Sequence, residues 1–382
     1  MRVLMVSAMA PYLPCHDGFR VIPANLLRPL GDRHELHLIA LADGTETAGQ
    51  LAWPRPHCRS VEILPAASPS GILGRLARLP RALGSRVAQT VRARLQTLEP
   101  DALHLEGPSL APLAALGGGI RTVLSAHDAL SLRYREFATF ARSRRERAVY
   151  GMREALARRF ERRWVGRADR VVVTSPVDLE ALRRSVPGER LTVIPNGVDL
   201  DYFAYRPDPR PGRLVFTGNM SWPPNEDAAE HFATEVFPRI RRAAPGAEFW
   251  IAGASPSARV RALERHPGVH VTGTVPDLRE WIWSASVYVS PIRFGVGVKN
   301  KILEAMALGA PIVATPKSLT GTPLVHGRHL LVAEDSAHLA ESVAKVLHDD
   351  ALAHRLSKAA RLHVEHEYAW ESIAARFEAL YG

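Results

Sequence analysis

The chain has 382 residues, of which 46% are hydrophobic and 23% are charged. This length is enough for two ordinary domains with separate cores, and this composition is typical of a globular protein rather than a disordered one. No run of 18 or more consecutive apolar residues occurs, and residues 1–7 are too short an apolar segment for a secretory signal, so we expect neither a transmembrane helix nor export.

The cysteines and histidines of the chain indicate its cellular compartment and whether it can hold a metal ion. Cys15 and Cys58 are the only cysteines, which excludes a disulfide framework and a multi-cysteine metal site. The 16 histidines are scattered without the spacing of zinc ligands. We therefore expect a cytoplasmic protein with no intrinsic metal site and no resident cofactor.

Short β-branched segments alternate with helical patterns in both halves of the chain, which predicts an α/β protein with two parallel-sheet, Rossmann-like domains. The predicted strands of the first half are 3–7, 35–40, 60–64, 102–104, 122–125 and 171–174, and those of the second half are 191–194, 214–217, 248–252, 269–272, 287–290 and 311–314. Pro187-Gly188 and Pro195-Asn196-Gly197 punctuate the region between the halves. We accordingly place the domains at 1–190 and 191–368, followed by an amphipathic helix in about 369–382.

Polar residues follow several strands of the first half. Ligands of Rossmann-like sheets bind beyond the carboxyl ends of the strands, so these residues are candidates for a cleft. They are His16, Asp17 and Arg20 after the first strand, His104 and Glu106 after another, and His127 after the strand at 122–125. The alternatives are a solvated polar loop for the first group and a structural role for His127, with Asp128 either orienting its ring or capping the next helix.

The net charge of +10 is concentrated in residues 131–170, where thirteen arginines stand against five acidic residues. Val149, Met152, Leu156, Phe160 and Trp164 recur there at helical spacing and predict one apolar stripe. The stripe can dock on the core while the arginines coat the outside, or the arginine face can meet an anionic acceptor or membrane. No nucleic-acid-binding motif accompanies the segment, so we expect no nucleic-acid partner.

The segment 293–307 places two glycines, two lysines and a carboxylate in one turn between a strand and a helix. Glycines allow close approach of a ligand to the backbone, and a helix N-terminus favours anions. If the helix begins near Asn300, Lys301 and Glu304 share a face, with the lysine suited to phosphate oxygens and the glutamate to hydroxyl groups. The segment therefore predicts a nucleotide site, although such turns also occur without ligands and the pair could be a solvated ion pair.

Several motifs resemble those of retaining glycosyltransferases of the GT-B fold, the family-4-like group. They are Lys301-Ile302-Leu303-Glu304-Ala305-Met306-Ala307 with Gly309 and Pro311, Val193-Ile194-Pro195-Asn196-Gly197-Val198-Asp199, Phe216-Thr217-Gly218-Asn219-Met220, and Thr272-Gly273-Thr274-Val275-Pro276-Asp277. Their order and spacing match along essentially the whole chain. The resemblance implies two Rossmann-like domains facing a cleft, with the C-terminal helix returning to the first domain.

The resemblance also implies roles for individual residues. His127, Lys299 and Lys301 would be catalytic, with His127 contacting the donor sugar and the lysines stabilising the leaving diphosphate without a metal. Glu304 would accept hydrogen bonds from ribose, unless its charge merely favours the helix N-terminus. The other residues implied to bind donor are Gly18, Gly218, Asn219, Val275, Arg293, Gly297 and Asn300, and the acceptor candidates are His16, Asp17, Arg20, His104 and Glu106.

Two departures from the family pattern stand out. The loop after Phe216 lacks the arginine and lysine of the related enzymes, which shifts the phosphate-binding role to Lys299 and Lys301, with Arg293 as a further candidate. The second carboxylate, eight positions before Glu304, is replaced by Val296.

The expected function is transfer of a sugar, with retention, from a nucleoside diphosphate sugar to an unknown hydroxyl acceptor. UDP is the expected base, and the acceptor is an envelope glycan or lipid or a small secondary metabolite. The competing hypotheses are a nucleotide-sugar epimerase or hydrolase of the same fold, and a basic protein that binds membrane or nucleic acid.

Overall fold

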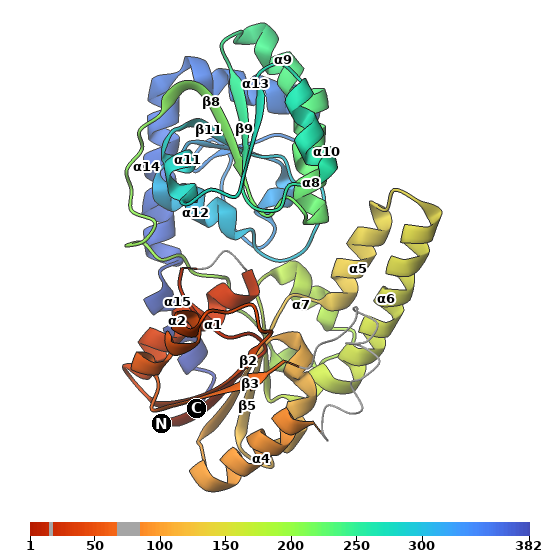
Figure 1. The fold of residues 1–382 in the computed structure, drawn as a ribbon, viewed down its shortest axis with the longest axis vertical. Helices are drawn as coiled ribbons and strands as arrows, with labels where there is room; N and C mark the ends of the chain where they lie inside the picture. The colour runs from red at the N-terminus through yellow and green to blue at the C-terminus, as the bar shows by residue number, and fades with distance from the viewer. Residues whose placement is uncertain (15–17, 67–84) are drawn as a thin grey trace. The chain divides into compact units, whose positions relative to one another are not determined.

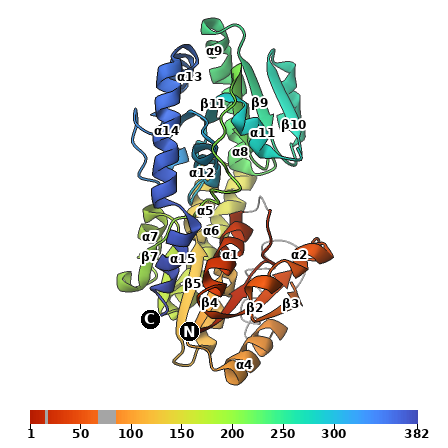
Figure 2. The ribbon, with the colours of Figure 1, turned by 90° about the vertical axis from the view of Figure 1, so that its left-hand side faces the viewer.

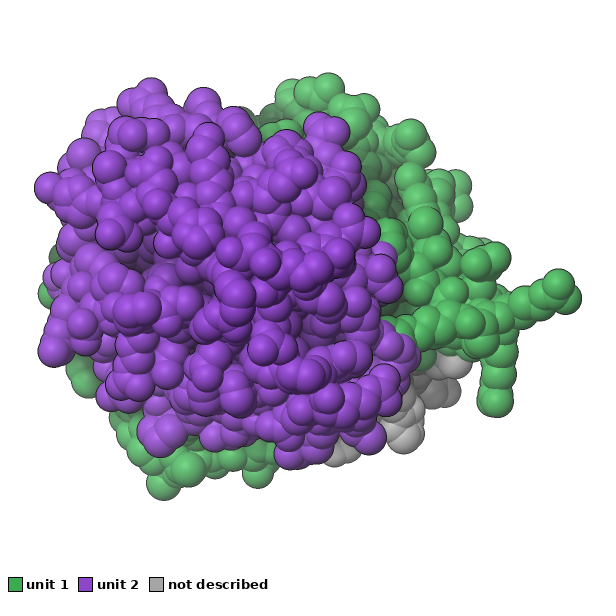
Figure 3. Space-filling model, turned by 90° about the horizontal axis from the view of Figure 1, so that it is seen from above, with its two compact units in different colours: residues 1–196, 370–382 green, residues 197–369 purple. Residues whose placement is uncertain are grey.

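The computed structural model describes residues 1–14, 18–66 and 85–382. His16 and Asp17 lie outside the described residues. The chain divides into two compact units, residues 1–196 with 370–382, and residues 197–369 (Figure 3).

The first unit is built on a parallel sheet of seven strands in the order β3-β2-β1-β4-β5-β6-β7 (Figures 1 and 2). Its strands are β1 (Arg2–Ser7), β2 (Glu35–Ala42), β3 (Ser60–Pro65), β4 (Ala102–Glu106), β5 (Arg121–His127), β6 (Arg170–Val173) and β7 (Leu191–Val193). Its helices are α1 (Gly18–Gly31), α2 (Ala48–Ala52), α4 (Arg86–Leu98), α5 (Leu130–Thr139), α6 (Arg144–Trp164), α7 (Pro176–Leu182) and α15 (Trp370–Glu378), with 3₁₀ turns at Arg55–His57, Pro108–Leu116, Val165–Arg167 and Gly188–Arg190.

Both faces of this sheet are covered, which is why its strands are mostly apolar rather than strictly alternating. On one face, Ile22 and Leu26 of α1 pack with Ile373 and Phe377 of α15. Figure 2 shows α15 lying beside α1. On the other face, Phe160 and Trp164 of α6 join the core with α4. The C-terminal helix is therefore an integral part of the first unit.

The second unit has a parallel sheet of six strands in the order β10-β9-β8-β11-β12-β13. Its strands are β8 (Arg210–Thr217), β9 (Glu248–Ala252), β10 (Val269–Gly273), β11 (Ala285–Ser290), β12 (Ile312–Ala314) and β13 (Leu331–Val332). Its helices are α8 (Pro223–His231), α9 (Phe237–Ala243), α10 (Ala258–Arg261), α11 (Leu278–Trp283), α12 (Asn300–Leu308), α13 (Ser336–His348) and α14 (Asp350–Glu367), with a π-helical turn at Phe232–Val236 and 3₁₀ turns at Ala262–Arg265 and Pro316–Leu319.

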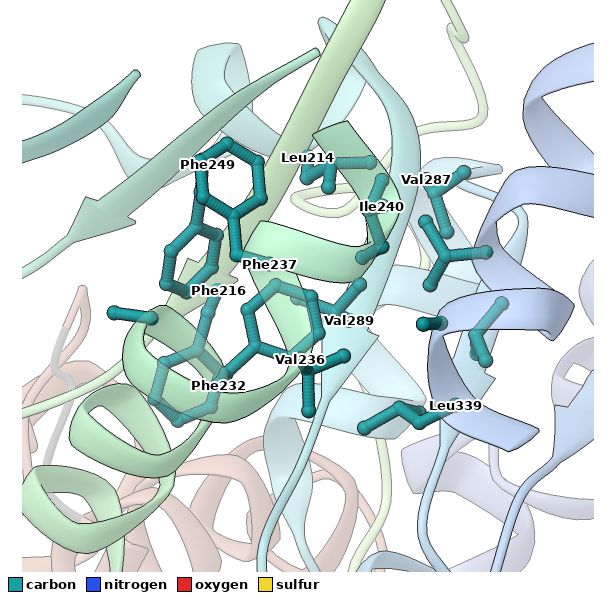
Figure 4. Packing of buried hydrophobic residues seen from close by; sticks show 14 of the residues in the cluster. Leu214, Phe216, Phe232, Val236, Phe237, Ile240, Phe249, Val287, Val289 and Leu339 are labelled. Carbon is teal, nitrogen blue, oxygen red and sulfur yellow. The ribbon is translucent and has the colours of Figure 1, made fainter. Parts of the chain in front are cut away.

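The core of the second unit on the α8, α9 and α13 side is aromatic. Phe232 packs against Phe249 with ring centroids 4.5 Å apart, and Phe237 lies 5.9 Å from the same ring (Figure 4). The opposite face of the sheet is covered by α12 and α14 through residues such as Ile302 and Val364. These two layers fix the ends of β8 and β11, from which the donor-site candidates extend.

The structure contains every predicted strand, and it confirms the predicted α/β architecture with two Rossmann-like sheets. The assignment of residues 191–194 to the second half was wrong, because β7 pairs in parallel with β6 of the first sheet. The unit boundary consequently falls after Asn196 rather than after residue 190. Local pattern identifies a strand but not its pairing partner, which explains the error.

The apolar stripe predicted for α6 is only partly buried. Phe160 and Trp164 are buried, whereas Met152 is 45% exposed. The stripe reaches the core only in the second half of the helix, because the first half pairs instead with α5 as a helical hairpin (Figure 1). Among the described residues, no helix combines the length and the apolar character needed to cross a membrane.

Candidate functional site

The candidate nucleotide site lies where the order of the second sheet reverses. β8 has β9 on one side and β11 on the other, so the loops that follow β8 and β11 are neighbours at the carboxyl edge. Gly295 and Gly297 in the second of these loops have φ values of 119° and 70°, which a residue with a Cβ seldom adopts. The loop leads directly into α12, whose first residue is Asn300, as the sequence predicted.

Lys301 joins the two loops. Its Nζ donates to the carbonyl oxygen of Thr217 at 2.6 Å and to Oδ1 of Asn225 at 2.8 Å. The same Nζ lies 4.3 Å from the ring centroid of Phe216, in a cation–π arrangement. Burial lowers the pKa of Lys301 to about 7, because the charged form loses solvation there. An ammonium so poorly solvated would gain strongly from a neighbouring phosphate.

Glu304 lies one helical turn further along α12. Burial raises the pKa of its carboxyl group to about 7, an effect opposed by the charge of Lys301. The lysine and the glutamate therefore form a coupled pair on one face of the helix, as their spacing predicted. Cation and carboxylate together can bind a phosphate and a polyol, the two components of a nucleotide.

The structure places the other two cations of this segment differently from the prediction. Nζ of Lys299 donates to the carbonyl oxygens of Val296 and Gly297 at 3.0 and 2.7 Å, so it closes the glycine turn. The guanidinium of Arg293 donates to both carboxylate oxygens of Asp227 at 2.8 and 2.6 Å. Arg293 is thus held by a bidentate ion pair with α8, and its predicted role in donor binding stays a prediction.

The loop after β8 is closely packed. A Cβ on Gly218 would lie 2.6 Å from Nδ2 of Asn225 and 2.8 Å from Nζ of Lys301, so only glycine fits. Asn219 directs its Oδ1 to the backbone N–H and hydroxyl of Ser221, at 3.0 and 2.8 Å. Val275 lies in the loop after β10. The N–H of Gly253, in the loop after β9, donates to the carbonyl of Gly273 at 3.1 Å and so connects the two loops.

In the first unit, His127 ends β5 with a φ of 62° and is buried. Its Nε2 lies 2.9 Å from Oε2 of Glu106, whose Oε1 lies 2.8 Å from Nε2 of His104. Asp128 forms an ion pair with Arg133. The predicted acceptor-binding role of His104 and Glu106 is corrected, because both side chains are buried and bonded within the first unit.

Arg20 lies on α1, which begins at Gly18. Its guanidinium forms a 3.3 Å ion pair with the buried Glu46 and lies over the ring of Tyr12, 4.4 Å from the centroid. Nε and Nη1 of Arg20 are buried and find no hydrogen-bond partner among the described residues. Unpaired buried donors are costly, so Arg20 remains a candidate for binding an acceptor oxygen.

Sequence reasoning missed two residues that the structure brings into these sites. Asn225 contacts Lys301, and Tyr381 donates its hydroxyl to His104. The separations of 76 and 277 residues leave no local pattern that would reveal either contact. Within residues 1–14, 18–66 and 85–382, no three metal-ligating side chains gather as a metal site.

Two parallel Rossmann-like sheets in one chain are the architecture of GT-B glycosyltransferases. Residues 18–202 match the Glycosyltransferase Family 4 family, and residues 211–349 match the Glycosyl transferases group 1 family. The chain belongs to the family-4-like glycosyltransferases of group 1.

Two curated relatives come from Mycobacterium tuberculosis. Phosphatidyl-myo-inositol mannosyltransferase is 27% identical over 367 residues, covering 90% of this chain and 91% of the relative. Glycogen synthase is 28% identical over 206 residues, and this match covers 50% of the chain and only 48% of glycogen synthase.

Solved structures agree on the fold. Sucrose-phosphate synthase from Thermosynechococcus elongatus superimposes with a TM-score of 0.75 at 17% identity, covering 100% of this chain and 98% of that one. Anabaena HepE in complex with UDP-glucose gives a TM-score of 0.67 at 15% identity, and the match covers 99% of this chain and 98% of HepE. Both similarities establish the GT-B architecture.

Proposed function

We propose that the chain is a retaining hexosyltransferase that moves a sugar from a nucleoside diphosphate sugar, with UDP as the base, to a hydroxyl acceptor. The observation that carries this proposal is the placement of Lys301 and Glu304 on one face at the start of α12, beside the glycine loop after β8. The complex of Anabaena HepE with UDP-glucose supports the choice of UDP.

Departure of a nucleoside diphosphate requires stabilisation of negative charge while the sugar acquires positive charge. In the proposed reaction the ammonium of Lys301 and the N-terminus of α12 stabilise the departing phosphate oxygens, and Glu304 accepts hydrogen bonds from the ribose hydroxyls. These groups can act without a metal ion. The leaving phosphate would take the acceptor proton on the same face, so the anomeric configuration is preserved.

The acceptor is proposed as a glycan, a lipid or a small metabolite that presents a hydroxyl group. Arg20 would bind an acceptor oxygen through its Nε and Nη1, whereas Glu46 neutralises its charge. The name of the mycobacterial mannosyltransferase specifies a lipid acceptor for that relative.

A lipid-linked acceptor receives support from the end of the α5–α6 hairpin. Phe140 at the turn is 37% exposed, Met152 further along α6 is 45% exposed, and Arg142, Arg144, Arg145 and Arg147 near the turn are exposed. Exposed apolar groups with neighbouring arginines suit the interface of an anionic membrane. We therefore also propose peripheral membrane contact through residues 131–170.

Thermal-shift measurements against UDP-, GDP-, ADP- and dTDP-sugars test the donor. At 100 times its dissociation constant, a true donor adds about 2.7 kcal/mol of stability. Turnover that persists in EDTA supports metal independence. Failure of all four nucleotides to bind would overturn the proposal, and release of free sugar in the presence of every acceptor tested would favour a hydrolase.

A further inference from the structure

A buried chain of hydrogen bonds links the C-terminal segment to the end of β5. The hydroxyl of Tyr381 lies 2.6 Å from Nδ1 of His104, and Nε2 of His104 lies 2.8 Å from Oε1 of Glu106. Oε2 of Glu106 lies 2.9 Å from Nε2 of His127. The four residues are 2%, 0%, 2% and 6% exposed, so solvent does not replace these partners.

The positions of the protons follow from the donors and acceptors. The two imidazole N–H groups lower the pKa of Glu106 to about 2, against the opposing effect of burial, so the carboxylate is ionised and accepts from both rings. Both histidines consequently carry a proton on Nε2. In neutral His104, Nδ1 is then the acceptor for Tyr381, whose pKa burial raises well above its usual value and whose hydroxyl stays protonated.

His127 is held in an unusual backbone conformation. Its φ of 62° lies in the left-handed region, and the pairing of β5 with β6 slips between Ser125 and His127. Such a conformation is energetically unfavourable and persists only where neighbouring contacts hold it. The carbonyl of His127 accepts from the N–H of Thr174 at 2.8 Å, and Glu106 holds the ring.

Tyr381, at the C-terminal end of this chain of hydrogen bonds, is itself held in place by packing. The ring of Phe377 stacks on His104 with centroids 5.4 Å apart, and Tyr381 meets the same imidazole edge-on at 5.8 Å. Glu378 of α15 forms an ion pair with Arg33 at 2.8 Å, and its Oε1 lies 3.0 Å from Nε2 of His34. The last turn of the protein therefore packs against the residues that support His127.

We infer that Glu106 and Tyr381 are positioning residues, which fix the orientation of His127 and its Nε2-protonated tautomer through His104. In this tautomer Nδ1 of His127 carries no proton, so it can accept a hydrogen bond but cannot donate one. The inference rests on the proposed function, because it assumes that His127 contacts the donor sugar. The inference gives the C-terminal segment a role in the reaction site in addition to its role in the fold.

The test uses the full chain labelled with ¹⁵N-histidine. Long-range ¹H–¹⁵N spectra distinguish the two tautomers, and His104→Gln and His127→Gln variants assign the signals. In wild type, both rings should be protonated on Nε2. Glu106→Gln replaces one acceptor oxygen by an NH₂ donor, so one of the two rings must change tautomer. A purely packing role for Glu106 predicts no such change.

Kinetics separate positioning from nucleotide binding. In Glu106→Gln, turnover of UDP-glucose, or of whichever donor the thermal-shift screen identifies, should fall at least tenfold, while affinity for UDP stays within twofold. Tyr381→Phe keeps the aromatic ring and should lower turnover about threefold, with a shifted His104 signal. Glu371→Gln is the matched control, because Glu371 is exposed on α15 and belongs to none of these contacts, and it should leave both readouts unchanged.

The inference is overturned if Glu106→Gln leaves both tautomers and turnover as in wild type. If Glu106→Gln does not fold, the wild-type spectra and the Tyr381→Phe variant test the inference instead. An Nδ1-protonated His127 in wild type, or an unshifted His104 signal in Tyr381→Phe, would overturn the inference. Absence of nucleotide binding and turnover in wild type would instead contradict the proposed function, and the spectra would still decide the tautomers.

Discussion

Nζ of Lys301 lies 2.8 Å from Oδ1 of Asn225, and this contact connects the first turn of α12 to α8. Nδ2 of the same asparagine donates to the carbonyl of Asn219 at 2.9 Å, so one amide holds both the cation and the loop after β8. Because the loop lacks the basic residues of related enzymes, this arrangement leaves Lys301 as the cation that joins the two loops.

A double-mutant cycle tests this contact. Lys301→Met and Asn225→Leu each leave a buried polar group without its partner, and each should destabilise the protein by about 1–3 kcal/mol. The double variant should cost less than their sum by about 0.5–3 kcal/mol, measured by urea unfolding. Additive costs would show that the two residues do not interact.

Turnover in the same variants separates the effect of the Lys301 charge from the effect of its positioning by Asn225. Lys301→Met should nearly abolish turnover of the intact donor, because the ammonium acts on charge that develops in the transition state. Asn225→Leu retains the ammonium and should keep measurable turnover. Lys317→Met, on the 3₁₀ turn Pro316–Leu319, is a control of the same chemistry and should behave as wild type. Normal turnover in Lys301→Met would exclude the catalytic role.

Glu304→Gln should weaken donor binding with little change in side-chain volume. A hydrogen bond to a charged group contributes about 1.5–3 kcal/mol, which corresponds to at least a tenfold loss of affinity in calorimetry. Glu280→Gln is the matched control, because Glu280 is exposed on α11 of the same unit. Equal affinity in wild type and Glu304→Gln would remove this carboxylate from the site.

Binding of UDP should move protons, with a sign that depends on pH. The pKa values of Lys301 and Glu304 are both about 7. At pH 8, a bound diphosphate raises the pKa of the lysine and a proton is taken up. At pH 6, ribose hydroxyls favour the ionised glutamate, which lowers its pKa and releases a proton.

Calorimetry of UDP binding in two buffers with different ionisation enthalpies measures this exchange. Proton uptake at pH 8 should disappear in Lys301→Met, and release at pH 6 should disappear in Glu304→Gln. Identical heats in both buffers at both pH values would contradict the assignment of the pair.

Replacement of Arg142, Arg144, Arg145 and Arg147 by glutamine should abolish sedimentation with phosphatidylglycerol vesicles. A basic residue near an anionic surface contributes about 1 kcal/mol, and high salt should have the same effect on wild type by screening. The control replaces four other exposed arginines by glutamine and should leave sedimentation unchanged; these are Arg183, Arg184, Arg239 and Arg242. A wild-type protein that ignores these vesicles at low salt would favour a soluble acceptor.

The sequence by itself determined the positions of the strands, the loops at their carboxyl ends and the common face of Lys301 and Glu304. These features follow from short-range physics, because apolar periodicity, glycine conformation and helical spacing act between residues a few positions apart. The family motifs carried the same information along most of the chain. They also located His127 at the end of β5.

The tertiary structure decided which of these polar groups are partners. Arg293 meets Asp227, Lys301 meets Asn225, and Glu106 with His104 faces inward toward Tyr381. Each contact joins segments at least 66 residues apart. Such contacts depend on which strands pair and which helices cover a sheet, and no local pattern specifies that. Burial then set the pKa values of Lys301 and Glu304, because solvation is lost only when the surrounding chain has folded around them.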